Sequence, residues 1–292
     1  MNAEIHTLDK ASWRNEAGLR LLQEIPQPPD TLYYQGTLPT DSMTLLSVVG
    51  SRQYTTYGRQ VVETLIGQLA GYPVGIVSGL AKGIDSLAHE AALQAGLYTL
   101  AIPGSGLNRN VLYPKQNQGL ADRIIQSGGG LLSELTPDTK AARFTFPQRN
   151  RLMAGVSQAT LVIEAGEKSG TLITARMTVD YNRELLVVPG SIFSPQSQGV
   201  HQFLKLGATP VTSGEDIAEV LGVSKTNNSA STDTTTYTET EQTLLDLLTE
   251  PADIDSLIQQ SNLPAQTVSA TLMELEIKGN VLVVNGLYQR KI

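Results

Sequence analysis

The sequence predicts an α/β protein with a doubly wound, mainly parallel sheet and a second, smaller domain at the C-terminus. Between residues 44 and 222, short apolar runs alternate with helical patterns. A stretch rich in Ser, Thr and Asn follows, and the chain then closes with helical patterns and a hairpin signal. Strands that are apolar throughout are typical of parallel sheets covered by helices on both faces.

Residues 1–43 are expected to form a short lead-in rather than a domain. Leu19–Ile25 has the spacing of a short helix, and Pro26 ends it because proline cannot continue a helix. Leu32–Tyr34 is predicted to be a small edge strand.

Residues 44–222 are expected to form the sheet domain. The apolar runs predict strands at Leu45–Val49, Val74–Ser78, Tyr98–Ile102, Gly130–Ser133, Thr160–Glu164, Leu185–Val188 and Thr209–Val211. The intervening patterns predict helices at Tyr57–Ala70, Ile84–Ala95, Gln116–Ser127, Arg149–Ser157 and Thr171–Tyr181.

Residues 223–238 are predicted to be a flexible linker, because such a polar stretch cannot bury enough apolar surface to fold. Residues 239–292 show three helical patterns followed by two apolar runs around Asn285-Gly286, a strong hairpin signal. Three helices and a hairpin form a winged-helix pattern, which is related to the helix-turn-helix. The predicted helices are Glu241–Leu248, Ile254–Gln260 and Ala265–Lys278.

The composition restricts the functions that are possible. The chain has 292 residues, 40% hydrophobic and 17% charged, which suits a soluble protein with one large and one small domain. The absence of cysteine excludes disulfides and thiolate metal sites and favours a reducing cytoplasm. The N-terminal residues resemble neither a signal nor a transit peptide, and no apolar run approaches bilayer-spanning length. With a net charge of −7, any nucleic-acid site must be local.

The predicted strands end in loops of small residues, and most of these loops also contain a cation. Parallel sheets bind ligands outside the carboxyl ends of their strands, so these loops are expected to meet at one edge. Residues 143–176 alone hold five Lys/Arg against two carboxylates, with Phe144 and Phe146 among the cations. Cations interleaved with aromatic rings suit a single-stranded nucleic acid, because Arg binds phosphate and a ring stacks under a base. Each part alone has an ordinary explanation as a turn glycine or a solvated arginine.

Cofactor, metal and catalytic patterns are absent from the sequence. Neither a dinucleotide-binding G-x-G-x-x-G nor a Walker-type loop follows a predicted strand. The three histidines are far apart and lack metal-ligand spacing. Glu134 and Glu164 follow strands, but they are expected to bond loop amides or balance arginines. We therefore expect a non-enzymatic protein without a cofactor or metal.

Several motifs occur in a characteristic order, among them VGSR, SGLAKGIDSLAHEAAL, FPQRNRLMAGVS and VIEAGEKSGTLITA. In these motifs the chain resembles the DprA (Smf) family of bacterial DNA-processing proteins, over about residues 28–222 and again in the winged-helix tail. The resemblance implies a Rossmann-like domain that binds single-stranded DNA, protects it, dimerises, and loads the RecA recombinase during natural transformation. It implies no catalysis.

The DNA contacts of the family carry over to positions within these motifs. They correspond to Ser51 and Arg52 of VGSR, Arg143, and Phe146, Arg149, Asn150 and Arg151 of FPQRNR. Ser78, Gly79, Lys82, Lys168 and Ser169 fall in loops of the same rim. The dimer contact of the family resembles Val200–Val211, where Phe203, Leu204 and Leu206 give an apolar surface, although this segment equally suits an ordinary core helix.

Two departures from the family pattern limit what the resemblance implies. Many relatives carry a helical N-terminal module, for which the residues before the sheet are too few. The winged-helix region is acidic, with three Lys/Arg against eight Asp/Glu in residues 239–292, a net charge of −5. A duplex-reading helix should offer Arg or Lys, so this domain is expected to contact protein or help trap DNA.

Two other functions stay open from the sequence. The first is a nucleotide-processing phosphoribohydrolase of the lysine-decarboxylase-like (LOG) type, which needs a P-G-G-x-G-T-x-x-E motif. Pro103–Gly106 and Glu167–Thr171 approach that motif, but neither places the catalytic glutamate. The second is a regulator whose winged helix binds promoter DNA, against which the acidic tail argues.

Overall fold

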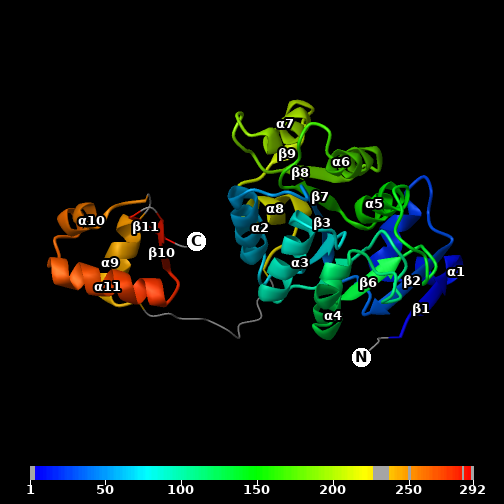
Figure 1. The fold of residues 1–292 in the computed structure, drawn as a ribbon, viewed down its shortest axis with the longest axis horizontal. Helices are drawn as coiled ribbons and strands as arrows, with labels where there is room; N and C mark the ends of the chain where they lie inside the picture. The colour runs from blue at the N-terminus through cyan, green and yellow to red at the C-terminus, as the bar shows by residue number, and fades with distance from the viewer. Residues whose placement is uncertain (1–3, 226–236, 249–250, 285, 291–292) are drawn as a thin grey trace. The chain divides into compact units, whose positions relative to one another are not determined.

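The computed structural model describes residues 4–225, 237–248, 251–284 and 286–290 (Figure 1). The chain divides into two compact units, Met1–Asn227 and Asn228–Ile292. Most of the linker predicted at 223–238 lies outside the described residues. None of the helices within the described residues is long and apolar enough to span a bilayer.

The first unit is built on one nine-stranded sheet in the order β1-β2-β6-β5-β4-β3-β7-β8-β9. Strands β3 to β9 pair in parallel, whereas β2 pairs antiparallel with both β1 and β6. The mainly parallel sheet is confirmed, and each strand predicted between residues 44 and 222 is present. The strands are β1 (His6–Asp9), β2 (Thr31–Gly36), β3 (Thr44–Val49), β4 (Val74–Ser78), β5 (Thr99–Ala101), β6 (Gly130–Ser133), β7 (Ala159–Val162), β8 (Glu184–Val187) and β9 (Thr209–Pro210).

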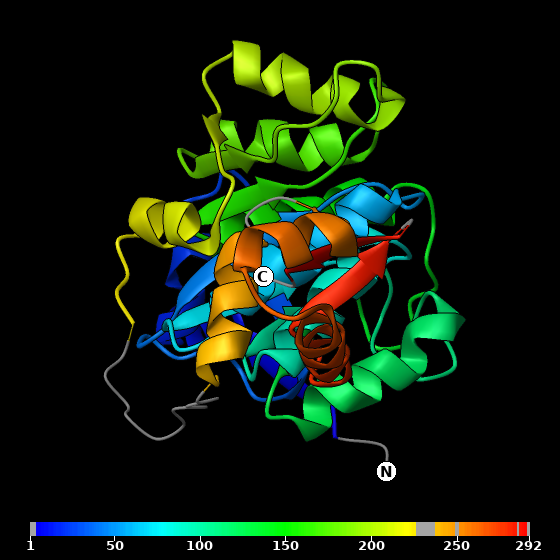
Figure 2. The same cartoon turned by 90° about the vertical axis from the view of Figure 1, so that its left-hand side faces the viewer.

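Helices cover both faces of this sheet, as a doubly wound fold requires. One face packs against α2 (Thr56–Gln68), α3 (Ile84–Gln94) and α8 (Gly214–Leu221), and α4 (Gln118–Gln126) lies beside α3. The other face packs against α5 (Thr145–Val156), α6 (Thr171–Asp180) and α7 (Gln198–Lys205). Helices α6 and α7 lie next to one another at the β8–β9 end of the sheet (Figures 1 and 2).

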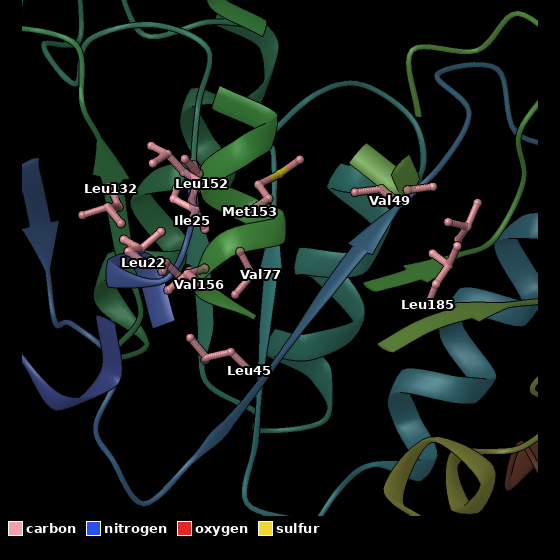
Figure 3. Packing of buried hydrophobic residues seen from close by; sticks show 14 of the residues in the cluster. Leu22, Ile25, Leu45, Val49, Val77, Leu132, Leu152, Met153, Val156 and Leu185 are labelled. Carbon is pink, nitrogen blue, oxygen red and sulfur yellow. The ribbon is translucent and has the colours of Figure 1, made fainter. Parts of the chain in front are cut away.

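The expected lead-in is an integral part of this unit. It contains β1, α1 (Lys10–Arg14), the 3-10 helix η1 (Ala17–Gln23) and β2. The prediction of an edge strand was wrong, because β2 lies between β1 and β6. Trp13, Leu22 and Ile25 are buried in the core. Figure 3 shows Leu22 and Ile25 against Leu152 and Val156 of α5, so the N-terminal residues support the helix that carries the FPQRNR motif.

Helix α5 begins at Thr145, four residues before the predicted start. The Thr145 hydroxyl donates to the Gly104 carbonyl, which fixes the start of the helix over the end of β5. Pro147 is tolerated because it lies in the first turn, where backbone N–H groups have no partner within the helix. Phe146 therefore lies inside the first turn of α5 rather than before the helix.

The second unit is a winged helix, as predicted. It consists of α9 (Glu239–Leu247), α10 (Ile254–Ser261) and α11 (Ala265–Ile277), followed by the antiparallel pair β10 (Val281–Val284) and β11 (Leu287–Arg290). The N-terminus of α9 is closed by a reciprocal capping box between Thr238 and Glu241. The unit has its own small core of leucines and valines from all three helices and β10.

The first unit also contains two short 3-10 helices, η2 (Lys115–Asn117) and η3 (Pro195–Ser197).

Candidate nucleic-acid interface

A cavity of about 650 Å³ opens at the carboxyl edge of the sheet. Its walls come from loops that follow β3, β4, β7 and β8 and from the first turns of α5 and α6. Loops distant in sequence therefore meet at one edge, as the topology predicts. Of the predicted DNA contacts, the cavity is lined by Ser51, Arg52, Arg143, Phe146, Arg149, Asn150, Lys168 and Ser169.

The ring of Phe146 is held in place from several sides. The Arg52 guanidinium carbon lies 5.3 Å from the centroid of the Phe146 ring, which is cation–π distance. The Tyr113 ring is 5.8 Å from it, centroid to centroid. A Cβ on Gly104 would come within 2.6 Å of the Phe146 ring, so only glycine leaves room for it. The site thus presents an exposed cation beside a positioned aromatic ring.

Arg149 lies on the floor of the cavity rather than on its rim. Its residue is only 5% exposed, and its Nη1 donates to the carbonyls of Gly79 and Ile102. Burial lowers the pKa of Arg149 to about 10, while the carboxylate of Asp85 opposes the shift. The guanidinium therefore stays positive at neutral pH. Arg149 joins the loops that follow β4 and β5 to α5 and gives the cavity floor a positive charge.

Asp85, which the sequence did not indicate as a site residue, is a buried carboxyl group near Arg149. It lies in the first turn of α3, lines the cavity and is 7% exposed. Burial raises the pKa of the Asp85 carboxyl, and the Arg149 cation opposes that rise. A Cβ on Gly79 would lie 2.0 Å from Arg149 Nη1 and 2.5 Å from Asp85 Oδ2. The glycine after β4 is therefore needed, because a side chain at this position would collide with both groups.

Four predicted contacts lie outside the main cavity. Ser78 is fully buried and its hydroxyl donates to the Val48 carbonyl, so the prediction that it lies on the rim was wrong. Arg151 pairs with Glu134, with both side chains nearly buried, and the structure does not bring it to the cavity. Gly79 and Lys82 line a smaller neighbouring cavity of about 30 Å³, which they share with Arg52 and Phe146.

The two strand-end glutamates have structural roles, as predicted. Glu164 is buried and accepts a 2.9 Å hydrogen bond from the Thr55 backbone amide. Glu134 balances Arg151; burial raises the pKa of its carboxyl, and the Arg151 cation opposes that shift. Within the described part of the chain, no group of three or more His, Asp or Glu is placed to hold a metal ion.

The segment after β8 contributes a wall that no sequence motif indicated. Pro195 and Gln196 line the cavity, and the Gln196 carbonyl accepts a 2.7 Å hydrogen bond from the Ala165 amide. This bond ties η3 to the loop that follows β7. Because the segment has neither a charge nor a glycine-rich pattern, only the fold shows that it belongs to the site.

The predicted dimer surface is smaller than the sequence suggested. Phe203 is 6% exposed and belongs to the core, so the prediction that it forms a surface contact was wrong. Leu204 packs partly against the same core. Leu206 is 81% exposed. Leu206 lies beyond the last residue of α7, at its C-cap, whereas Phe203 lies within the helix and packs on the core.

Comparison with known proteins identifies the family of this chain. The family model for DNA recombination-mediator protein A matches residues 6–222, the greater part of the chain. The chain belongs to the DprA family. A second model, the DprA winged helix domain, matches residues 228–286. DprA proteins are DNA-processing proteins, so the family resemblance drawn from the motifs is confirmed.

Relatives of known name support the same assignment. Protein Smf of Escherichia coli is 35% identical over 90% of this chain and 72% of its own length. DNA processing protein DprA of Streptococcus pneumoniae is 43% identical over 67% of this chain and 68% of its own length. The X-ray structure of the Streptococcus pneumoniae DprA covers 74% of each chain with a TM-score of 0.68 and 38% identity.

A Helicobacter pylori DprA structure is also similar, with a TM-score of 0.66 and 27% identity, covering 75% of this chain and 96% of that one. It was solved to describe a single-stranded DNA binding mode of that protein. The DprA fold of the first unit is thus shown by two solved relatives.

Proposed function

We propose that this DprA-family protein binds single-stranded DNA along the cavity at the carboxyl edge of its sheet. One observation carries the proposal. Among the described residues, the ion pairs engage cations elsewhere and leave out the exposed cations at the cavities, which are Arg52, Lys82, Arg143 and Lys168. Unpaired cations around a positioned aromatic ring suit a chain of phosphates and bases.

The chemistry of this site favours sequence-tolerant binding. Every base has a π-face, so a ring such as Phe146 stacks on any of them. Phosphates carry no sequence information, and the exposed cations bind them without regard to the base. Four cations on four phosphates predict a salt dependence of roughly −2.8 in log affinity against log salt, at about −0.7 for each phosphate.

The proposal extends to the role of the bound strand. In this proposal the protein protects incoming single strands, acts as a homodimer in the cytoplasm, and passes the strand to the RecA recombinase during transformation, without catalysis. Membership of a recombination-mediator family supports this role.

The exposed side chain of Leu206 offers the proposed homodimer an apolar contact. The mass in solution, measured for the native protein and Leu206→Glu, tests the dimer.

The binding proposal is tested by fluorescence anisotropy with a labelled single strand and its duplex across a salt series. Arg52→Glu is expected to weaken single-strand binding about 10- to 100-fold, because it removes a charged hydrogen bond worth about 1.5–3 kcal/mol. Arg59→Glu is the matched control, since Arg59 is exposed and pairs with Glu63 on α2, outside the cavity lining. The native protein is expected to prefer the single strand.

A different result would favour the enzyme alternative. Equal, weak binding to single strand and duplex that Arg52→Glu leaves unchanged would mean that the cavity takes a small phosphate ligand. Release of free base from a nucleoside monophosphate would then support the phosphoribohydrolase.

A further inference from the structure

Two apolar side chains project from the loop between β8 and η3. Ile192 is 75% exposed and Phe193 is 89% exposed, and we call them the 192–193 tip. The tip is held in a turn, because the Ser194 amide donates to the Ser191 carbonyl at 3.0 Å and the Phe193 amide donates to the Ser191 hydroxyl at 3.2 Å. The backbone thus holds a large ring in solvent, where burial on a ligand would be favourable.

The 192–193 tip adjoins the cavity. Pro195 and Gln196, which follow it after Ser194, line the cavity wall. That wall is anchored to the loop after β7, because the Gly199 amide donates to the Ala165 carbonyl at 2.8 Å. The same loop carries Lys168, an exposed cation of the cavity. The tip is therefore continuous with the proposed binding surface.

The order of the strands places the tip at the opposite end of the site from Phe146. Phe146 packs over Gly104, which follows β5, whereas Phe193 follows β8. Between β5 and β8 along the edge lie β4, β3 and β7, so four strand spacings of about 4.8 Å separate β5 from β8 by roughly 19 Å. Arg52 follows β3 and Lys168 follows β7, two strands that lie between β5 and β8.

We propose that Phe193 is a second base-stacking platform for the same single strand whose first base stacks on Phe146. This inference rests on the proposed function and deepens it. Phosphates between the two bases bind Arg52 and Lys168. At about 3.4 Å per stacked nucleotide, the span of roughly 19 Å holds up to about six nucleotides. The site therefore has a footprint defined by two rings at its ends.

The inference predicts a dependence on the length of the strand. Oligothymidines of about 3 and about 12 nucleotides are titrated into the full-length protein and into Phe193→Ala. The variant is expected to bind the longer strand about 5- to 100-fold more weakly, the usual loss of one stacked base, and to bind the shorter strand with unchanged affinity. Abasic nucleotides at the far end of the longer strand are expected to remove the difference between the two proteins.

Companion variants separate stacking from other roles of the ring. Phe193→Trp is expected to retain affinity, whereas Phe193→Leu keeps an apolar side chain without a ring and is expected to lose it. Val179→Ala is the matched control, because Val179 is 56% exposed, near the end of α6, and absent from the cavity lining.

Each other outcome would overturn the inference. If Arg52→Glu weakens binding and Phe193→Ala does not, the second platform is wrong while the proposed function stands. If neither variant nor strand length changes the affinity, both fail. If Phe193→Ala instead changes the mass of the protein in solution and leaves DNA affinity unchanged, the tip belongs to an interface between protein chains.

Discussion

The two units of this protein both have folds associated with nucleic acids, yet their surfaces differ in charge. The carboxyl edge of the sheet presents Arg52, Arg143 and Lys168 outside the ion pairs of the described residues. Helix α11, which would be the recognition helix of the winged helix, exposes Met273 (65%) and Ile277 (81%) instead. Its exposed charges are carboxylates, and the lysine that follows it pairs with a glutamate of α9.

This difference in charge shows that the fold determines where side chains lie, whereas the residue types at those positions determine which ligand binds. A recognition helix binds duplex DNA when it offers Arg or Lys to phosphates and base edges. On α11, Glu274 and Glu276 flank the exposed Met273 and Ile277, so the helix face is apolar and acidic. At the sheet edge, the proposed single-strand site forms because loops from several strands each add one cation. The two units are therefore expected to respond differently to the same perturbations.

The largest expected effect is the loss of stability when Arg149, the buried cation on the cavity floor, is replaced. Arg149→Met removes the cation that opposes the raised pKa of the buried Asp85 carboxyl, and it leaves the carbonyls of Gly79 and Ile102 without their donor. A buried polar group left without its hydrogen-bond partner costs about 1–3 kcal/mol, so the loss of both bonds is expected to lower the free energy of unfolding by about 2–6 kcal/mol. Trp13, the single tryptophan of the chain, is buried in the first unit and reports its unfolding by fluorescence.

Arg52→Met is the control for this experiment. Arg52 is exposed, so its loss is expected to change the free energy of unfolding by about 0.5 kcal/mol or less. An equal loss of stability in both variants would show that the cavity arginines do not divide into a supporting and a binding group.

A smaller effect should separate the two units by pH. His89 in α3 is fully buried; its Nδ1 contacts the Thr99 hydroxyl at 2.7 Å, and its Nε2 has no partner among the described residues. Burial lowers the pKa of His89 to about 3. The unfolded chain therefore binds a proton near pH 6.5 that the folded unit does not, and stability falls as pH drops from 6.5 toward 3.

The size of this loss is about 1.4 kcal/mol per pH unit, or roughly 2 kcal/mol at pH 5. His89→Asn keeps a donor near the position of Nδ1 and has no titrating group, so the slope of its Trp13 unfolding free energy against pH should be flatter by that amount. A native protein as stable at pH 5 as at pH 7 would contradict the assignment.

The winged helix should resist the same change of pH. A hydrogen bond from Lys278 and one from the Thr238 amide hold the pKa of Glu241 below its ordinary value. A carboxyl with a depressed pKa contributes stability that is lost only when pH falls through that depressed pKa. Between pH 6.5 and 5, hydrogen exchange is therefore expected to speed up in the first unit and not in α9.

The sequence predicts the sheet well because each strand is a local apolar run. It fails for β1 and α1, which are short and gain their stability from contacts with the rest of the core. Helix α5 was predicted too short because its first turn is fixed by a bond to Gly104, far away in sequence.

For the candidate site as well, the sequence predicts some features and misses others. The motifs select the correct loops, because glycine and arginine types are visible in the sequence. They do not distinguish exposed Arg52 from buried Arg149, since that difference comes from Gly79 and Asp85 on other segments. Ser78 was misplaced because its position at the strand end does not reveal that its hydroxyl bonds to the Val48 carbonyl of the neighbouring strand.

The smallest expected effect tests whether charge alone explains why the winged helix is not expected to bind duplex DNA. Glu274→Lys combined with Glu276→Lys places two cations beside the exposed face of α11. If charge is the missing ingredient, duplex affinity should rise and its salt slope should steepen by roughly 1.8, at about 0.9 for each phosphate contacted. Single-strand affinity should stay unchanged because the proposed single-strand site lies in the first unit. Asp255→Lys, at an exposed position of α10, controls for net charge, which it changes by +2 against +4 for the double variant. If Asp255→Lys raises duplex affinity as much, net charge attracts the duplex; if neither change has an effect, the shape of the α11 face excludes duplex DNA regardless of its charge.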